Sequence, residues 1–242
     1  MSNSPLVSYT KLSPNHSGQR THVVDRITPH CVVGQCSVET LGNIFAPTSR
    51  QASCQYGIGV DGRVGMYVEE KNRSWCSSSN ANDQRAITIE CASDATHPYA
   101  FNDAVYAKLI ELCTRYGKTK LLWLGDKTKT LNYEPASNEM VLTVHRWFAN
   151  KSCPGDWMYA RMGDLASKVT AKLGGSAGGT EKPADNQALY RVQTGAFSNK
   201  TNADAMLQKV KAAGFDTYMV KVDNLYKIQV GAFSKKANAD AM

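Results

Sequence analysis

The sequence predicts an α/β protein in which a mixed central β-sheet is flanked by helices, followed by a small α+β unit that stops before its fold is complete. Two observations indicate this. Short β-branched segments alternate with helical apolar patterns over residues 1–173, and a second pattern occurs twice within residues 189–242. Between them, residues 174–188 have the Gly, Ser and Pro composition of a flexible linker. We therefore expect two domains joined by this linker.

The composition is that of an ordinary folded chain. It has 242 residues, of which 42% are hydrophobic and 20% charged, enough for one large or two modest domains. No apolar run approaches the roughly 20 residues of a membrane span, so we expect no membrane insertion. The net charge of +7 favours an anionic partner. The basic residues neither cluster on one helix nor alternate with aromatic residues, which argues against nucleic acid.

The cysteines and the first residues bear on the compartment. Seven cysteines are scattered along the chain, an odd number that favours a reducing environment. Several of them, including Cys91 and Cys113, are expected to be small buried hydrophobes. Residues 1–20 lack the apolar core of a signal peptide and show no period. We expect them to form an arm along the domain or a frayed end.

Alternation of β-branched residues predicts the strands of the first domain, and apolar residues three or four apart predict its helices. The predicted elements are a strand at 22–33, a helix at 37–45, a hairpin at 53–69 turning at Asp61-Gly62, a loop at 73–83, a strand at 85–93, a helix at 102–116, a strand at 120–124 and helices at 135–150 and 157–173. In the helix at 135–150, Val141 and His145 share one face, so the imidazole is expected to point inward.

Three residues offer the ligands of a catalytic zinc ion, which takes three protein ligands and leaves a fourth position to water. His145 and Cys153 lie close together in the chain. The third ligand should come from a distant strand end, and His30 fits because it follows Pro29 at the end of a predicted strand. A structural zinc site with four protein ligands is the alternative. Cys31 would then be the fourth, although strand alternation should point it the other way.

These residues resemble a family pattern. In the zinc-dependent N-acetylmuramoyl-L-alanine amidases of phage endolysins and bacterial wall recycling, relatives of the peptidoglycan recognition proteins, a His ends the first core strand. Far downstream come a second His, a Lys, and a Cys or Asp followed by Pro-Gly. The matching residues are His30, His145, Lys151 and Cys153, the last followed by Pro-Gly, and the resemblance covers roughly residues 20–173.

The resemblance implies hydrolysis of the amide between N-acetylmuramic acid and L-alanine in peptidoglycan. Zinc would lower the pKa of a bound water from 15.7 toward roughly 7. Glu90, in an Ile-x-Ile-Glu match to the family, would take the water proton and pass it to the leaving amine. Lys151 would face the developing oxyanion. The alternative for Glu90 is a surface carboxylate on an edge strand.

Three more residues are expected to contact substrate. In the family, the hairpin often carries a Tyr or His that faces the metal. This chain departs from that pattern and has Tyr56 shifted into the aromatic position. Many relatives have Trp-His where this chain has Trp75-Cys76. Trp75 and Asn80, from the loop at 73–83, are expected to form a wall of the glycan and peptide groove; alternatively Trp75 plugs the edge of the core.

The second domain contains an internal repeat. Residues 190–206 recur as residues 226–242, both with the pattern Tyr-x-Val/Ile-Gln-x-Gly-Ala-Phe-Ser. The pattern resembles the sporulation-related (SPOR) repeat domain, a β-α-β-β-α-β sandwich that holds denuded glycan strands. The sequence stops inside the second predicted helix, so we expect an open sheet edge where a last strand is missing. An ordinary α/β cap is the alternative.

Together these features predict a wall-lytic zinc amidase with peptidoglycan as its partner, acting on the bacterial cell wall. The alternative is a non-catalytic peptidoglycan-recognition protein. Inactive relatives usually lack the Cys ligand, so the presence of Cys153 favours the enzyme. Without a signal peptide, we expect the protein to stay cytoplasmic until released by a phage holin or exported by another route. The sequence leaves the oligomeric state open.

Overall fold

The structure is a computed structural model and describes residues 2–116, 118–174, 190–213, 217–222 and 224–233. It divides into two compact units, Met1–Glu181 and Lys182–Met242. Almost all of the predicted linker and the second predicted helix of the repeat lie outside the described residues, as does the predicted open edge after that helix. None of the helices described is long and apolar enough to cross a membrane.

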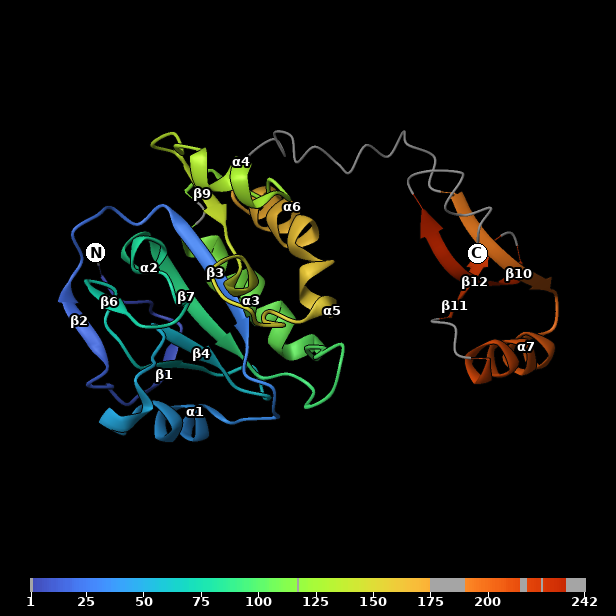
Figure 1. Cartoon of the computed structure of the whole chain (residues 1–242), viewed down its shortest axis with the longest axis horizontal. Helices are drawn as coiled ribbons and strands as arrows, with labels where there is room; N and C mark the ends of the chain where they lie inside the picture. Colours follow the sequence, from blue (N-terminus) through green and yellow to red (C-terminus); the bar gives the residue numbers. More distant parts are fainter. Residues whose placement is uncertain (1, 117, 175–189, 214–216, 223, 234–242) are drawn as a thin grey trace. The chain divides into compact units, whose positions relative to one another are not determined.

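A seven-stranded mixed sheet forms the centre of the first unit (Figure 1). Every neighbouring pair of strands is parallel except β5 and β4, which form the predicted hairpin. In spatial order the strands are β1 (Val7–Thr10), β5 (Val64–Met66), β4 (Tyr56–Ile58), β7 (Ala86–Cys91), β3 (Arg26–Cys31), β9 (Glu139–Leu142) and β8 (Lys120–Leu122). A separate antiparallel pair consists of β2 (His16–Gln19) and β6 (Asn72–Ser74). The predicted mixed sheet flanked by helices is confirmed.

Helices lie on both sides of this sheet (Figure 1). Two long helices, α3 (Asp103–Tyr116) and α6 (Met162–Lys172), contribute to the main apolar core, whereas α1 (Val38–Phe45) contributes to a second, smaller cluster. The remaining helices are short. They are α2 (Asn80–Arg85), α4 (Lys127–Asn132), α5 (Asp156–Tyr159) and the 3-10 turns η1 (Thr48–Arg50) and η2 (His145–Trp147).

Strand alternation gives the central strands one apolar and one polar face. On β7, Ile87 and Ile89 belong to the main core with α3 and α6, so Thr88 and Glu90 point to the opposite face. On β3, Ile27 and Cys31 likewise join the core. His30, between them in the alternation, therefore shares the polar face with Glu90. This face is where a site can form without interrupting the core.

Of the two alternatives predicted for residues 1–20, the frayed end is wrong and the arm along the domain agrees with the contacts. The arm contains strands that were not predicted: β1, which adds a parallel edge strand beside β5, and β2, which pairs with β6. Both strands have only four residues, with half-buried and exposed side chains in alternation. Such short strands are stabilised mainly by their tertiary partners, so their local pattern is too weak to recognise.

The predicted helix at 135–150 is also wrong. Residues Glu139–Leu142 form β9, which lies between β3 and β8, and His145 begins the turn η2. Val141 pairs in register with Arg26 on β3. A short apolar run rich in β-branched residues fits a buried strand as well as a helix, and here the parallel partners on both sides decide for the strand. The predicted helix at 157–173 is divided into α5 and α6.

The second unit contains a three-stranded antiparallel sheet in the order β10 (Tyr190–Phe197), β12 (Leu225–Phe233) and β11 (Tyr218–Val222), with α7 (Lys200–Ala212) following β10. The two copies of the repeat pattern are neighbours, because Tyr190 pairs with Phe233 and Phe197 pairs with Tyr226. Ala203 on α7 and Ile228 on β12 are fully buried. The order strand, helix, strand, strand is the one predicted from the repeat.

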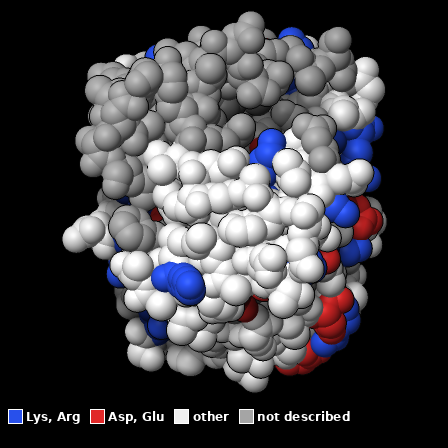
Figure 2. All heavy atoms as spheres, turned by 90° about the vertical axis from the view of Figure 1, so that its right-hand side faces the viewer, with Lys and Arg blue, Asp and Glu red and all other residues white. Residues whose placement is uncertain are grey.

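Charged side chains are scattered over the face of the molecule drawn in Figure 2. Basic and acidic groups lie next to one another at one edge, and isolated basic groups stand within broad uncharged areas.

Candidate metal centre

His30 lies near the end of β3 and is fully buried. It pairs in register with Glu90 on the adjacent parallel strand β7, and its Nδ1 lies 4.0 Å from Glu90 Oε1. Its Nε2 is buried and has no hydrogen-bond partner among the residues that the structure describes. A buried imidazole nitrogen without a partner is costly, which is the first sign that this ring serves a group from outside the chain.

His145 reaches the same place from the turn after β9. Val144 is extended, and the carbonyl of His145 accepts hydrogen bonds from the backbone N–H groups of Phe148 and Ala149, which closes the turn η2. The His145 ring lies 5.1 Å from the His30 ring, centroid to centroid, at 61°. Its Nε2 is 2.9 Å from Ser78 Oγ. The two imidazoles therefore converge. The predicted helix is not what brings His145 here, because it follows strand β9, which pairs with the strand of His30.

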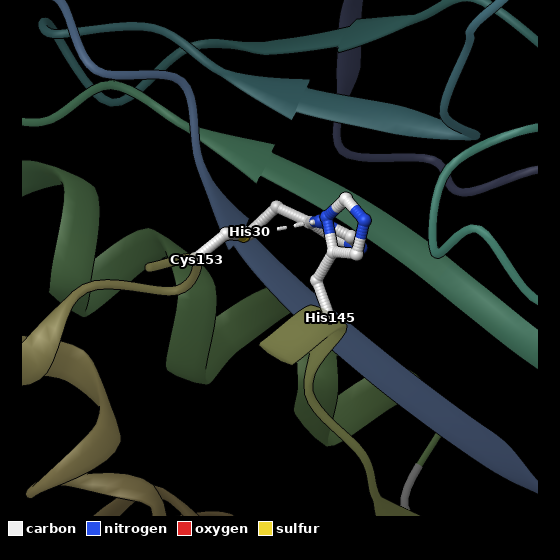
Figure 3. Close-up of side chains that lie close together, drawn as sticks. All are labelled: His30, His145 and Cys153. Carbon is white, nitrogen blue, oxygen red and sulfur yellow. Dashed lines mark hydrogen bonds between the residues drawn. The ribbon is translucent and has the colours of Figure 1, made fainter. Parts of the chain in front are cut away.

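Cys153 is brought in by the loop after η2. The backbone N–H of Arg146 donates to the Cys153 carbonyl at 3.1 Å, and the N–H of Gly155 donates to the Ser152 carbonyl at 2.8 Å. These two bonds fold the loop back on the turn that carries His145. The Sγ of Cys153 then lies 3.2 Å from the Nδ1 of His30, as the close-up in Figure 3 shows.

The donor set fits a zinc ion. One ligand atom each from His30, His145 and Cys153 lie within 4.8 Å of one another. Imidazole and thiolate bind zinc at about 2.0–2.3 Å. To do so around one ion, the three ligand atoms need to move only slightly closer together than 4.8 Å. Cys31, the suggested fourth ligand, belongs to neither metal-binding group found among the described residues, and its side chain joins the apolar core instead. Three protein ligands are what an open catalytic site has.

A second group shares His30 and adds Cys76 and Glu90, again with ligand atoms within 4.8 Å of one another. The Cys76 thiol is 3.9 Å from Glu90 Oε1. The two groups share His30, so an ion bound to His30 could be completed by either pair of further ligands. Variants of Cys76 and Cys153 distinguish between them.

Burial favours the neutral form of both imidazoles, which is the form that binds metals. Burial, with a further contribution from His145, holds the pKa of His30 well below its usual value. Burial also lowers the pKa of His145, helped by the positive charge of Lys151. Desolvation thus keeps two nitrogen ligands free of protons near neutral pH.

The acidic groups are shifted in the opposite sense. Burial raises the pKa of the Cys153 thiol well above its usual value, and neighbouring Cys31 and Glu90 add to this. Burial raises the pKa of Glu90 to about 7, with Arg50 and the Cys76 thiol partly offsetting it. One oxygen of Glu90, Oε2, is buried without a partner among the described residues. No positive charge of the described residues is in direct contact with either group, and a metal cation would supply one.

A cavity of about 530 Å³ opens beside the cluster. It brings together four of the residues that the sequence singled out, together with His145. Its lining includes Glu90, His145, Lys151, Trp75, Asn80, Arg50 and Arg73. Two predicted catalytic residues and two predicted substrate contacts therefore share one cavity.

Tyr56 does not lie in this cavity. It pairs in register with Ile89 on β7 and so lies on the apolar face of the sheet, where it is fully buried. Its hydroxyl donates to Glu70 Oε1 at 2.5 Å and accepts from the backbone N–H of Ser4 at 2.9 Å. The expected substrate contact is not supported, because a shift of one residue along a strand moves a side chain to the other face.

Several neighbours of the cluster were not predicted. Ser78, the partner of His145, has a left-handed backbone with φ of 60°, which is uncommon for Ser. The buried carboxylate of Asp83 accepts hydrogen bonds from the backbone N–H groups of Cys76 and Ser77 and holds this loop. Arg50 comes from η1. A loop of small polar residues carries no periodic signal, so only Cys76, as a departure from the family pattern, could be noticed in the sequence.

The fold and the cluster define a class: a mixed α/β protein with a His, His, Cys group on the polar face of its sheet. Comparison with known families narrows this. Residues 19–156 match the family described as N-acetylmuramoyl-L-alanine amidase, and residues 186–242 match the SPOR domain. Because the first match spans more than half of the chain, the protein belongs to the N-acetylmuramoyl-L-alanine amidase family, with a SPOR domain at its carboxyl end.

Solved structures are similar at low identity. A selenomethionine derivative of AmpD is 18% identical, with 69% of this chain and 99% of that chain covered and a TM-score of 0.47. PlyL is 13% identical, with 66% and 95% covered and a TM-score of 0.46. Human PGRP-IBETAC, in complex with glycosamyl muramyl pentapeptide, is 14% identical, with 65% and 94% covered and a TM-score of 0.46. No curated protein matches the sequence.

Proposed function

We propose that this protein hydrolyses the amide between N-acetylmuramic acid and L-alanine in peptidoglycan, with zinc held by His30, His145 and Cys153. The observation that carries the proposal is the convergence of these three side chains from a strand, a turn and a loop. Bound zinc would supply Lewis acidity, which makes water acidic and polarises a carbonyl. Family membership supports the same chemistry.

Glu90 is the proposed general base and acid. Strand register holds its carboxylate 4.0 Å from the His30 ring, and it lines the cavity. A carboxylate at that position can take the proton of the attacking water and deliver it to the amine of L-alanine as the amide breaks. The burial that raises its pKa also favours the protonated form that the first transfer produces.

Lys151 is the proposed oxyanion partner. Its side chain lines the same cavity, and its charge is close enough to lower the pKa of His145. As water adds to the carbonyl, negative charge develops on the carbonyl oxygen. A fixed positive charge facing that oxygen lowers the barrier because it interacts more strongly with the transition state than with the neutral amide.

Trp75 and Asn80 are proposed to hold the substrate on the far wall of the cavity. The indole N–H of Trp75 donates to Ser17 Oγ at 2.6 Å, so strand β2 orients the ring. Asn80 begins α2 and lines the same cavity. An oriented indole and an amide offer a flat apolar surface and hydrogen bonds, the two kinds of contact that a sugar ring and a peptide require.

The second unit is proposed to bind glycan strands of the same polymer. Its two repeat strands pair as neighbours, and its sequence matches the SPOR domain. Binding by one unit would raise the local concentration of scissile bonds at the other. The site of action is therefore proposed to be the bacterial cell wall.

Mass analysis of digested wall tests the proposal. Purified sacculi incubated with the zinc-loaded protein are expected to release peptides with a new L-Ala amino terminus and glycans with a free lactyl carboxyl group. Cleavage between sugars or within the stem peptide would contradict the proposed reaction. Binding to sacculi with no released fragment would instead identify a non-catalytic recognition protein.

A further inference from the structure

A second cavity, of about 460 Å³, lies beside the metal centre. It is separate from the proposed catalytic cavity but shares Ser78 and Ser79 with it, and Ser78 contacts His145. Its lining combines positive charge with apolar surface, from Arg26, Arg85, Lys127, Leu131, Trp147 and Phe148. No Asp or Glu is among the described residues that line it. A ligand in this cavity would meet cations without competing carboxylates on its walls.

Arg26 is the unusual member of this lining. It is only 4% exposed, and its Nε is buried without a hydrogen-bond partner among the described residues. The nearest carboxylate, Asp25, is 4.0 Å from its Nε and is already bound by Arg85 at 2.5 to 3.1 Å. Burying an N–H donor of a guanidinium without an acceptor is costly. The arrangement is accounted for if an anion in the cavity accepts from Arg26.

The other cations differ in how they are compensated. Arg85 binds both Asp25 and Glu134, so its charge is already balanced. Lys127, exposed at the start of α4, forms no ion pair or hydrogen bond within the described part of the chain. Within the described residues, Lys127 therefore has no charged partner, and Arg26 has only the 4.0 Å contact with Asp25, a carboxylate that Arg85 already binds.

The apolar wall is held rigidly. The ring of Trp147 stacks on Trp123 with centroids 5.1 Å apart and planes within 4° of parallel. Phe148 follows it and is partly exposed to the cavity. A ligand that places a charged group against Arg26 can therefore lay an apolar or sugar surface on a preformed wall.

We propose that this cavity is a second ligand site, which binds an oxyanion, either a carboxylate or a phosphate, between Arg26 and Lys127. A guanidinium binds either group through two parallel N–H bonds, and an ammonium binds it as a point charge. Peptide carboxylates and polyol phosphates both present this chemistry. The site needs no turnover at the metal centre, so binding can be measured separately from the proposed hydrolysis.

Titration of the full-length protein with inorganic phosphate, at constant ionic strength set with chloride, tests this site. Nitrogen-15 NMR of the Arg26 Nε–H and Trp147 indole N–H signals is expected to show saturable shifts. The Lys127→Glu variant is expected to bind phosphate about tenfold or more weakly. Lys129→Glu is the matched control, since it lies on the same helix, is exposed and changes the charge equally but does not line the cavity.

Arg26→Gln provides a second variant, expected to abolish saturation. If circular dichroism shows that this variant does not fold, the comparison of Lys127→Glu with Lys129→Glu, both at exposed positions, still tests the proposal. Absence of saturable shifts in the wild type, or equal affinities for Lys127→Glu and Lys129→Glu, would overturn the proposal. Displacement of phosphate by muramyl dipeptide but not by its amidated form would assign the site to a peptide carboxylate. Displacement by glycerol phosphate would assign it to a phosphate.

Discussion

The carboxylate of Glu90 lies 4.0 Å from the Nδ1 of His30 because the two residues are register partners on the parallel strands β7 and β3. The distance between the proposed base and the proposed metal ligand is thus set by backbone pairing in the centre of the sheet. Such a base is held more precisely than one on a loop, because neither strand can move without disrupting the core.

Replacing Glu90 by Gln should abolish most turnover and leave the metal in place. Gln has nearly the same shape but cannot accept the water proton, so kcat is expected to fall by about 10²- to 10⁴-fold. Release of wall fragments and the zinc content of the same sample measure the two effects. Glu111→Gln, on the exposed side of α3, is the control. Loss of zinc in Glu90→Gln would instead make Glu90 a ligand.

The same variant predicts a pH effect on the stability of the metal-free protein. Burial raises the pKa of Glu90 from 4.5 to about 7, so the folded state holds this proton more tightly than the unfolded state. The free energy of unfolding should therefore fall as pH rises from about 4.5 to 7. The fall should be at most on the order of 3 kcal/mol, since the side chain is 16% exposed and water screens part of the effect. Glu90→Gln should lack this loss, as urea unfolding at pH 4.5 and pH 8 would show. Parallel curves for both proteins would contradict it.

Lys151→Met should lower kcat more than it raises KM. If Lys151 stabilises the oxyanion, its loss removes an interaction made in the transition state, and a decrease of about 10²-fold is expected. Steady-state kinetics on a soluble muropeptide measure both constants. Lys172→Met, at the end of α6, is the control. A rise in KM with unchanged kcat would show that Lys151 only binds substrate.

Gly155→Ala should disturb the metal centre from outside it. Gly155 has φ of 82°, and an added Cβ would lie 2.8 Å from the Pro98 carbonyl oxygen and 2.9 Å from the Tyr99 Cβ. The loop that carries Cys153 must then shift, at a cost of about 1–3 kcal/mol, and zinc affinity should fall. Gly18→Ala is the control that distinguishes backbone strain from a steric clash. Gly18 also has a positive φ, but its added Cβ would have no atom within 4 Å. Equal zinc affinity in both variants would exclude the expected shift.

Much of the fold was visible in the sequence because its strands and long helices carry strong periodic patterns. The hairpin at Asp61-Gly62 and the strand that carries Glu90 are where the patterns predict them. The helix predicted around His145 failed, because the three apolar residues of β9 fit either structure and the choice depended on β3 and β8. Even so, the His145 ring lies beside the His30 ring as expected, because β9 runs parallel to β3 and brings the chain to the same end of the sheet.

The site was predictable to the extent that chemistry and spacing define it. His30, His145 and Cys153 stand out because few residue types bind zinc. Tyr56 failed because a one-residue shift in β4 places its side chain on the opposite face of the sheet. Ser78 and Arg50 could not be found, since loops and turns bring them to the cavity only through tertiary contacts.

The most direct test of the central claim is the zinc content of the purified protein and two variants, measured by atomic emission after dialysis against metal-free buffer. We expect one zinc per chain in the wild type and in Cys76→Ala, and none in Cys153→Ala, because Cys153 and not Cys76 completes the group with both imidazoles. Zinc retained by Cys153→Ala, or lost from Cys76→Ala alone, would contradict the account.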